Sequence, residues 1–423
     1  MADYLQMDKK SLQQELESLQ KEYQSFNDMN LKLDMSRGKP SSEQLDISLP
    51  MQQVADYKDA SGIDARNYGQ LDGLPEAKTF FAEMMGVTPE ETIVGGNSSL
   101  HLMYTCVDLG WRKGFADSNK PICEEEKPKF LCPSPGYDRH FYITQDFGFE
   151  LVHVPMTLDG PDVDVVEELV QDPSVKGIWC VPVYSNPDGY VYSDETVRRL
   201  AAMQTASPDF KIFWDNAYAV HHLTDEAYTC LNILDACKEA GHENRPLLFC
   251  STSKITFSGA GVSAVAASKA NISSIMKHLF GQLISFDKMN QLRHVRYLKD
   301  QQGMAEHMKL HAEVVRPRFA VVLEGLESNL APCGDIAHWT NPKGGYFISL
   351  YALKGCATRI VDLCKQAGVV LTGAGAAYPY GKDPEDSHIR IAPTFPPINE
   401  LQTATQLLCV ATKIASLEKL LAD

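Results

Sequence analysis

A lysine that follows an apolar strand is the first candidate for chemistry in this sequence. The apolar run Leu247–Cys250 leads into Ser251, Thr252, Ser253 and Lys254, and glycines come soon after. Small hydroxyl residues and glycines let the backbone approach an anion, and serine hydroxyls can donate to phosphate oxygens. Burial lowers the pKa of a lysine and so increases the fraction of free amine, which imine formation requires. The alternative is a surface lysine whose apolar stem lies along the protein.

Two other polar residues also follow apolar runs. In KIFWDNAY, Asp215 ends the run and Tyr218 comes three positions later. A buried aspartate is costly unless a cation pairs with it, and a protonated pyridine nitrogen would be such a cation. In YSNPDGY, Asn186 begins a turn from which its amide could donate to a phenolate oxygen. Taken singly, Asp215 could instead cap a helix and Asn186 could belong to a plain turn.

The elements that position these residues are short apolar runs that alternate with helical segments, from about residue 66 to 270. Runs that are apolar on both faces and separated by helices indicate a mostly parallel sheet in an α/β fold. Polar residues after such strands gather at one sheet edge, where open α/β folds bind ligands. The predicted strands lie in residues 128–133, 151–155, 176–184, 211–215, 246–252 and 262–268.

The flanking regions predict a second, smaller α+β unit. Residues 11–26 have the spacing of an amphipathic helix, and residues 271–325 look helical throughout. The last hundred residues contain a strand after a glycine turn and a long final helix. We therefore predict three parts: an N-terminal helix and arm of the small domain (1–65), a large domain (66–295) and a C-terminal small domain (296–423).

Composition argues against several classes of function. The net charge of -16, with 55 acidic and 39 basic residues, is unfavourable for binding nucleic acid. No apolar run is long enough to cross a membrane, and the N-terminus does not resemble a secretory signal, so we expect a cytoplasmic protein. The cysteines and the adjacent His221 and His222 do not have the spacing of a metal site, and none is assigned.

Together the motifs resemble fold-type I aminotransferases that depend on pyridoxal 5'-phosphate (PLP), in particular type Ic aspartate aminotransferases, over nearly the whole chain. S-T-S-K is similar to the family's S-x-S-K, which implies that Lys254 binds PLP covalently and that Ser251 binds its phosphate. W-D-N-A-Y resembles D-x-x-Y, so Asp215 would pair with the pyridinium nitrogen and Tyr218 with the phenolic oxygen. Y-S-N-P-D-G-Y resembles N-P-x-G, which implies that Asn186 also binds the phenolic oxygen.

Further motifs imply the remaining cofactor ligands. G-G-N-S-S-L is similar to the family's phosphate loop at a helix N-terminus, which is Asn97, Ser98 and Ser99 here. C-P-S-P-G-Y-D-R-H resembles the segment whose aromatic residue, here Tyr137, stacks on the cofactor. R-N-Y-G-Q-L-D-G resembles the stretch whose tyrosine, here Tyr68, reaches the phosphate in the partner subunit. The resemblance therefore implies a homodimer with shared active sites.

The substrate side is implied by two motifs. Arg390 in H-I-R-I-A-P matches the arginine for the substrate α-carboxylate, and Gly38 in R-G-K-P resembles a glycine that touches substrate. The resemblance implies that Asn186 contacts the substrate as well. A distal carboxylate would need a second cation, for which the candidates are Arg37, Arg293 and Arg296. One departure stands out: the family's G-x-R-x-G after the lysine has no arginine in Gly261-Val262-Ser263.

The predicted reaction is transfer of an amino group from an amino acid, aspartate by resemblance, to a 2-oxo acid, 2-oxoglutarate by resemblance, in ping-pong order. A PLP-dependent lyase, or an aminotransferase with another amino donor, is the main alternative. A dehydrogenase is a weaker one, because GAGVSA at 259–264 and TGAGAA at 372–377 lack the strand–turn–helix context of a dinucleotide site. A regulator with an aminotransferase-like domain would need an N-terminal DNA-binding domain, for which the residues before the arm are too few.

Overall fold

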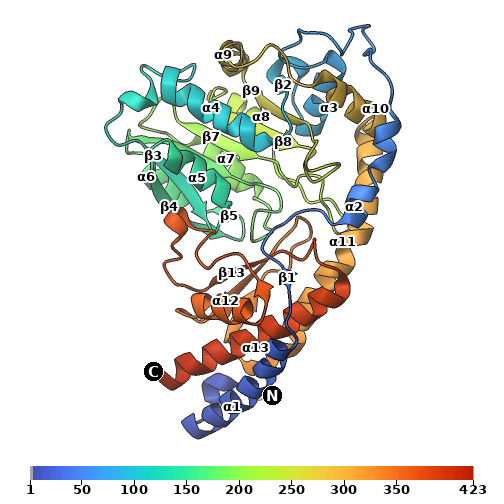
Figure 1. Cartoon of the computed structure of the whole chain (residues 1–423). Coiled ribbons are helices and arrows are strands. Elements are labelled where there is room, and N and C mark those ends of the chain that lie inside the picture. The colour runs from blue at the N-terminus through green and yellow to red at the C-terminus, as the bar shows by residue number, and fades with distance from the viewer. Residues whose placement is uncertain (1–2, 423) are drawn as a thin grey trace.

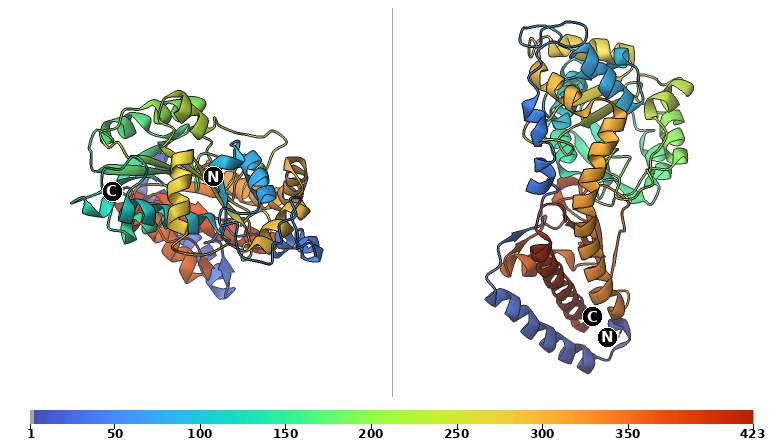
Figure 2. Two further views of the ribbon diagram at one scale, coloured as in Figure 1. Left: turned by 90° about the horizontal axis from the view of Figure 1, so that it is seen from above. Right: turned by 90° about the vertical axis from the view of Figure 1, so that its right-hand side faces the viewer.

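The computed structural model describes residues 3–422 and consists of two lobes (Figure 1). The larger lobe surrounds an eight-stranded sheet, and the smaller lobe contains both termini. The long helix α11, Gln301–Leu330, runs from one lobe to the other, as the side view in Figure 2 shows. Within residues 3–422, no helix is both long enough and apolar enough to span a membrane.

The large sheet has the strand order β2-β9-β8-β7-β6-β3-β4-β5. Strands β4, β3, β6, β7 and β8 are parallel to one another, whereas β9 is antiparallel to both of its neighbours, and β5 is antiparallel to β4. The prediction of a mostly parallel sheet is therefore confirmed. The strands are β2 (Thr92–Val94), β3 (Lys129–Ser134), β4 (Glu150–Thr157), β5 (Gly160–Pro161), β6 (Val175–Cys180), β7 (Lys211–Asp215), β8 (Pro246–Ser251) and β9 (Ser263–Ala267).

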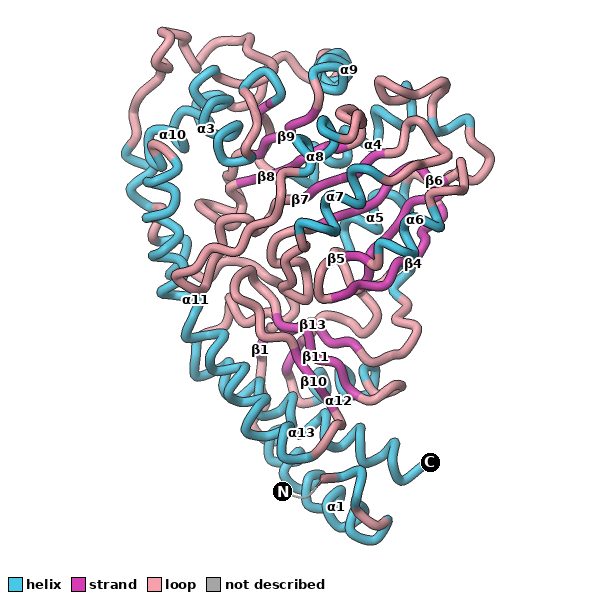
Figure 3. Tube along the Cα trace, turned by 180° about the vertical axis from the view of Figure 1, so that it is seen from behind, coloured by secondary structure: helices cyan, strands magenta, loops and turns pink. Residues whose placement is uncertain are grey.

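Helices cover both faces of this sheet, as the view from behind in Figure 3 shows. Successive residues of the central strands enter different cores: Ile212 and Trp214 pack on one face, and Phe213 packs on the other. This explains why the strands are apolar at every position. The helices of this lobe are α3 (Pro75–Met85), α4 (Ser99–Lys113), α5 (Asp138–Asp146), α6 (Val163–Leu169), α7 (Asp194–Ala202), α8 (Ile233–Glu239), α9 (Lys269–Leu279) and α10 (Lys288–Leu298).

The smaller lobe packs helices on a three-stranded antiparallel sheet of order β10-β11-β13. Segments from the two chain ends meet there, because β1 near the N-terminus pairs in parallel with β12. The strands are β1 (Leu33–Asp34), β10 (Ala337–Trp339), β11 (Ile348–Ala352), β12 (Val369–Val370) and β13 (His388–Ile391). The helices are α1 (Lys9–Asp28), α2 (Ser42–Asp46) in the arm, α12 (Ala357–Gln366) and α13 (Ile398–Ala422).

Two helical predictions differ in detail from the structure. The opening helix begins at Lys9, because the Asp8 side chain accepts a hydrogen bond from the amide of Ser11 and so caps it. The region predicted as helical from 271 to 325 is divided among α9, α10 and α11, with a loop at 280–287. Within α11, Met304 and Met308 belong to the large-lobe core, whereas Val315 and Phe319 belong to the small-lobe core.

Candidate active site

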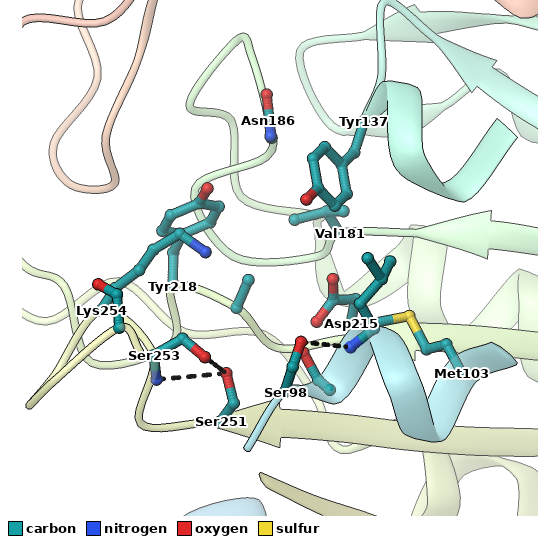
Figure 4. A pocket seen from close by; sticks show the side chains of 14 residues that line it. Ser98, Met103, Tyr137, Val181, Asn186, Asp215, Tyr218, Ser251, Ser253 and Lys254 are labelled. Carbon is teal, nitrogen blue, oxygen red and sulfur yellow. Dashed lines mark hydrogen bonds between the residues drawn. The ribbon is translucent and has the colours of Figure 1, made fainter. Parts of the chain in front are cut away.

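A cavity of about 230 Å³ lies at the carboxyl ends of β7 and β8 (Figure 4). This is the edge at which the polar residues after parallel strands were predicted to gather. The cavity brings together side chains that are more than 150 residues apart in the sequence. Its lining residues are Ser98, Ser99, Leu100, Met103, Tyr137, Val181, Asn186, Asp215, Ala217, Tyr218, Ser251, Ser253, Lys254 and Ser258.

Asp215, the last residue of β7, is a buried carboxylate that is only half satisfied. Its Oδ2 lies 3.0 Å from Nε2 of His140, a buried residue on α5. The His140 ring is stacked on Trp179, with ring centroids 4.4 Å apart and an interplanar angle of 11°. The other oxygen, Oδ1, is buried and has no hydrogen-bond partner within residues 3–422. A buried carboxylate oxygen without a partner is costly, and a positively charged donor would compensate its charge as well as its hydrogen-bonding capacity.

Lys254 points into the same cavity from the loop after β8 (Figure 4). Its Nζ lies 4.9 Å from the centroid of the Tyr218 ring. Burial lowers the pKa of Lys254 below its usual value, and the negative charge of Asp215 opposes this shift. The main-chain carbonyl of Lys254 accepts hydrogen bonds from Tyr346 Oη at 3.3 Å and His221 Nε2 at 3.2 Å. The lysine is therefore a partly desolvated amine on a fixed backbone.

Three further polar side chains surround the lysine and the aspartate. Burial raises the pKa of Tyr137 to about 12 and raises the pKa of Tyr218 above its usual value. Both phenols therefore keep their protons at neutral pH and can donate hydrogen bonds. Asn186 is buried, and its Oδ1 accepts a hydrogen bond from Arg390, which leaves the amide nitrogen directed toward the cavity (Figure 4).

The opposite end of the cavity is built to receive an anion. Helix α4 begins there, so its first-turn amides and the positive end of its dipole face the space. Serine side chains line the same end, and the hydroxyls of Ser251 and Ser253 lie 3.1 Å apart. Among the lining residues of the described chain, Lys254 is the only cationic side chain.

The structure explains why the arginine expected after the lysine is missing. Val262 takes its place and is only 2% exposed in the large-lobe core. The Val262 amide donates to Thr252 Oγ1 at 2.9 Å, and the carbonyl of Val262 accepts from the Thr252 amide. A long cationic side chain at this position would enter the core, so the hydroxyls and the α4 terminus are the groups at this end of the cavity that could bind an anion.

Arg390 on β13 lies beside Asn186, at the boundary between the lobes. Its Nη1 lies 3.3 Å from Asn186 Oδ1 and 3.5 Å from Asp138 Oδ1, and its guanidinium is 4.9 Å from the centroid of the Phe347 ring. The arm passes close by, because a Cβ atom on Gly38 would lie 2.3 Å from the Phe347 ring. The absence of a side chain at Gly38 thus lets the arm lie against this aromatic support.

Not all residues predicted for the site line the cavity of one chain. Asn97 contributes its carbonyl, which accepts from the Ser253 hydroxyl at 3.4 Å, and Tyr68 is 78% exposed on a surface loop. Among the arginines considered for a distal carboxylate, Arg37 is exposed and Arg296 is paired with Asp56 and Glu76. Arg293 has a buried Nε without a hydrogen-bond partner among the described residues.

Sequence reasoning missed four residues that contribute to the site. Ser253 lies within the lysine motif and Ser258 lies four residues after the lysine, so their hydroxyl side chains were a usable signal. His140 and Phe347 had no such signal. Each acts through a residue far away in the chain, Asp215 and Arg390 respectively.

An open α/β sheet with a lysine and an aspartate at its carboxyl edge, together with a second lobe that supplies an arginine, defines the fold-type I class of PLP-dependent transferases. The profile of the aspartate aminotransferase family matches residues 7–423. The chain belongs to this family. This confirms the predicted fold and the prediction that the protein is an aminotransferase, and it excludes the alternative that the protein is a dehydrogenase.

Relatives cover almost the whole chain. An aspartate aminotransferase of Corynebacterium glutamicum is 46% identical over 405 residues, which is 95% of this chain and 94% of that protein. The crystal structure of an aspartate transaminase from the same species has a TM-score of 0.97 at 44% identity and covers 99% of both chains. The α-aminoadipate aminotransferase of Thermus thermophilus, in complex with a phosphopyridoxyl-leucine adduct, shares the fold, with a TM-score of 0.73 at 20% identity over 92% of this chain and 93% of that one.

Members of the aminotransferase family use PLP, and the cavity residues fit this cofactor. The unpartnered Oδ1 of Asp215 suits a protonated ring nitrogen, which is the cation that the buried carboxylate lacks. The amine of Lys254 suits an aldehyde, and the α4 terminus with its serines suits a phosphate. The Asp215 carboxylate, the Lys254 amine and the anion site at the start of α4 all line one cavity.

Proposed function

We propose that the protein is a PLP-dependent aminotransferase that moves the amino group of aspartate to 2-oxoglutarate in ping-pong order. The observation that carries this proposal is the half-satisfied Asp215 in the same cavity as Lys254. The name and the 46% identity of the C. glutamicum relative support aspartate as the amino donor.

In this proposal, the residues implied by the motifs hold the cofactor. Lys254 binds its aldehyde carbon covalently, and Asp215 accepts a hydrogen bond from its ring nitrogen. Tyr218 and Asn186 donate to its phenolic oxygen, and Tyr137 covers the ring. The anion end holds the phosphate with Asn97, Ser98, Ser99, Ser251 and, beyond the motifs, Ser253 and Ser258.

PLP supplies an electron sink when it is bound, because its protonated ring withdraws electrons from the substrate Cα. The chain supplies the proton transfers and the orientation. With PLP bound, Lys254 would act as the general base for the proton on Cα and as the general acid that delivers a proton to the cofactor carbon. Burial lowers the pKa of Lys254 and so increases the fraction of free amine. Asp215 keeps the ring nitrogen protonated throughout.

Arg390 binds the substrate α-carboxylate in a bidentate fork, which fixes the Cα–H bond relative to Lys254. Phe347 beneath the guanidinium and Asn186 beside it already hold Arg390 in position. Gly38 lets the arm lie close to the bound substrate.

For the distal carboxylate we favour Arg293 among the three candidate arginines. The charge of Arg296 is already compensated by two carboxylates, whereas Arg293 retains a buried donor without a partner among the described residues. Arg293 does not line the cavity of its own chain. It lies on α10, whose Lys288 binds the backbone of the Tyr68 loop, so both residues would serve the site of the partner subunit.

The proposal includes a homodimer with shared active sites, a cytoplasmic location and the division into residues 1–65, 66–295 and 296–423. The hydrophobic core of the small lobe is separate from the cores on the two faces of the large sheet, which supports the division. The exposed Tyr68, which has no role within its own chain's cavity, supports the homodimer.

Borohydride trapping tests the covalent role of Lys254. Reduction of the PLP-loaded protein, followed by peptide mapping, should place the label on Lys254. Lys254→Ala should lose the label and turnover, whereas the exposed Lys269→Ala should keep both. A label on another lysine, or near wild-type kcat in Lys254→Ala, would refute the assignment.

The substrate is tested by comparing kcat/KM for aspartate, alanine and phenylalanine with 2-oxoglutarate as acceptor. Aspartate should be preferred by at least about 100-fold, the effect of one buried charge pair of roughly 3 kcal/mol. Arg293→Gln should remove most of this preference. Release of ammonia or carbon dioxide from aspartate without a 2-oxo acid would instead indicate a lyase.

A further inference from the structure

The turn at residues 186–189 of the large lobe lies beside the cavity and contacts the small lobe. Asn186 at its start binds Arg390 of the small lobe, and Gly189 at its end has a φ of +76°. A Cβ atom on Gly189 would lie 2.3 Å from Pro342 of the small lobe. The turn is therefore packed against the small lobe without room for a side chain.

Asp188, which lies between Asn186 and Gly189 in the turn, makes a second polar contact with the small lobe. Asp188 is 1% exposed, and its Oδ1 accepts a hydrogen bond of 2.8 Å from the hydroxyl of Tyr351 on β11. On the other side, the Tyr351 ring is stacked on His338, with ring centroids 4.9 Å apart. The donor is thus held in place by its own strand and by its neighbour β10.

The two polar contacts are in register. Strand β11 pairs with β13 so that Tyr351 lies opposite His388 and Ser349 lies opposite Arg390. Asn186 therefore binds a residue of β13 while Asp188, two residues further along the turn, binds a residue of the adjacent strand. Two contacts across two hydrogen-bonded strands fix both the position and the direction of the turn.

Asp188 depends on its hydrogen bond with Tyr351, because the partners of its carboxylate in the described chain, Tyr351 and Ser349, carry no positive charge. Burial raises the pKa of Asp188 to about 6, and hydrogen bonds from Ser349 and Tyr351 oppose this shift. Loss of the Tyr351 hydroxyl would leave a buried carboxylate with fewer donors, and the turn would move to bring Asp188 closer to water. Because Asn186 is in the same turn, such a movement would change its position relative to Arg390.

We propose that Asp188 and Tyr351 are positioning residues for the reaction: their hydrogen bond sets the Asn186–Arg390 geometry that receives the substrate α-carboxylate. The inference rests on the proposed function, since it assumes that Arg390 binds substrate. It adds to that function a pair that touches neither substrate nor cofactor and couples the two lobes at the substrate arginine.

Tyr351→Phe tests the pair, because it removes the hydroxyl and keeps the ring that stacks on His338. The KM for aspartate should rise roughly tenfold, the effect of one hydrogen bond to a charged group, while kcat changes less than about threefold. Affinity for the unreactive dicarboxylate succinate, measured by the change in cofactor absorbance, should fall by a similar factor. PLP content and thermal stability should stay close to wild type.

Tyr142→Phe on α5 is the matched control, since Tyr142 is 60% exposed and its hydroxyl donates none of the hydrogen bonds of the turn. It should leave KM and succinate affinity unchanged. Asp188→Asn, which keeps an acceptor for Tyr351, should be milder than Tyr351→Phe. The double variant should be no worse than Tyr351→Phe alone, because the hydrogen bond between the two side chains is already lost in that single variant.

Hydrogen–deuterium exchange separates this inference from the proposed function. The peptide that spans 184–190 should exchange faster in Tyr351→Phe than in wild type or Tyr142→Phe, whatever the substrate. Unchanged exchange and unchanged KM in Tyr351→Phe would overturn the pair's role. Wild-type protein that binds succinate and transaminates normally would in that case leave the proposed function intact, whereas an inactive PLP-loaded wild type would overturn both.

Discussion

At the scale of single residues, the site is organised around one buried carboxylate. His140 occupies one oxygen of Asp215 and is itself held by Trp179, so the carboxylate cannot rotate toward water. The second oxygen faces the cavity without a partner among the described residues. A preorganised charge in a dry pocket stabilises a cation more than the same charge would in water, because no solvent has to rearrange.

Asp215→Asn should therefore lower kcat by roughly 100-fold or more, since a neutral amide cannot hold a proton on the ring nitrogen. The measurement is single-turnover kinetics with aspartate, followed through cofactor absorbance. The exposed Asp146→Asn serves as the control and should react at the wild-type rate. If Asp215→Asn reacts at a rate within about threefold of wild type, another group keeps the ring nitrogen protonated.

The anion end gives a second prediction at this scale. With Val262 buried in place of an arginine, hydroxyls carry more of the phosphate contact than in a site with a guanidinium. The double variant Ser253→Ala and Ser258→Ala should raise the dissociation constant for PLP about 100-fold or more, since two hydrogen bonds to a charged group are lost and each costs roughly 1.5–3 kcal/mol. Affinity for pyridoxal, which lacks the phosphate, should not change. Equilibrium dialysis measures both, with the exposed Ser273→Ala as control.

At the scale of elements, three segments converge on the backbone of the lysine loop. Gln44 on the arm helix α2 donates to Tyr346 Oη at 3.0 Å, and Tyr346 donates to the carbonyl of Lys254. On α11, His311 lies 3.1 Å from His307, which donates to the carbonyl of Ile255 at 2.7 Å. This network, together with His221, ties the arm and the interlobe helix to the residue that we propose binds the cofactor.

The network predicts loss of stability in acid. Burial lowers the pKa of both His221 and His311 from 6.5 to about 3, so both are neutral in the folded protein. Below pH 6.5 the unfolded chain takes up protons that the folded chain does not. The free energy of unfolding should therefore fall as pH drops from 6.5 toward about 3, by up to roughly 1.4 kcal/mol per histidine per pH unit. Above pH 7 these histidines do not make the free energy of unfolding depend on pH.

Urea denaturation of wild type and His311→Gln between pH 5 and 8 measures this effect. The variant should have a lower unfolding free energy at pH 8 and a shallower decline below pH 6.5. Parallel declines for the two proteins would show that His311 does not bind an extra proton on unfolding.

At the scale of the whole molecule, one chain brings most of the predicted site residues to one cavity, whereas Tyr68 and Arg293 do not line it. Tyr68 is 78% exposed, although the backbone around it is held by Lys288 on α10, with hydrogen bonds of 2.6 and 2.9 Å to the carbonyls of Asn67 and Gly69. A rigid loop that presents an exposed aromatic residue is typical of an interface.

The homodimer proposal predicts complementation between inactive variants. Lys254→Ala and Tyr68→Ala, mixed and refolded or co-expressed, should give activity above the sum of the separate proteins. In the mixed dimer one site receives Lys254 from one chain and Tyr68 from the other. Light scattering should give twice the chain mass of 46.9 kDa. Monomers, or no gain on mixing, would contradict the shared site.

The sequence was sufficient to predict most of the fold and the centre of the site, and particular residues show why. Asp215 and the Ser251–Lys254 segment each follow a strand that is apolar on both faces, and strands of that kind form a parallel sheet whose carboxyl ends meet. Placement of Tyr137, Ser98 and Ser99 in the cavity agrees with their motifs as well. The continuous helical prediction over 271–325 was wrong at 280–287, because amphipathic spacing continues across short breaks between helices.

What the sequence alone determined was therefore the identity of the reactive groups, since a lysine, an aspartate or a turn asparagine at a strand end is specified within a few neighbouring residues. Only the tertiary structure decided which groups support them: His140 on Asp215, Phe347 beneath Arg390, and Tyr351 on Asp188. Each of these contacts joins residues that are more than 40 positions apart, and the contact between Tyr351 and Asp188 crosses between the lobes. Their partners are chosen by how helices and strands pack in three dimensions, a choice that no local stretch of sequence records.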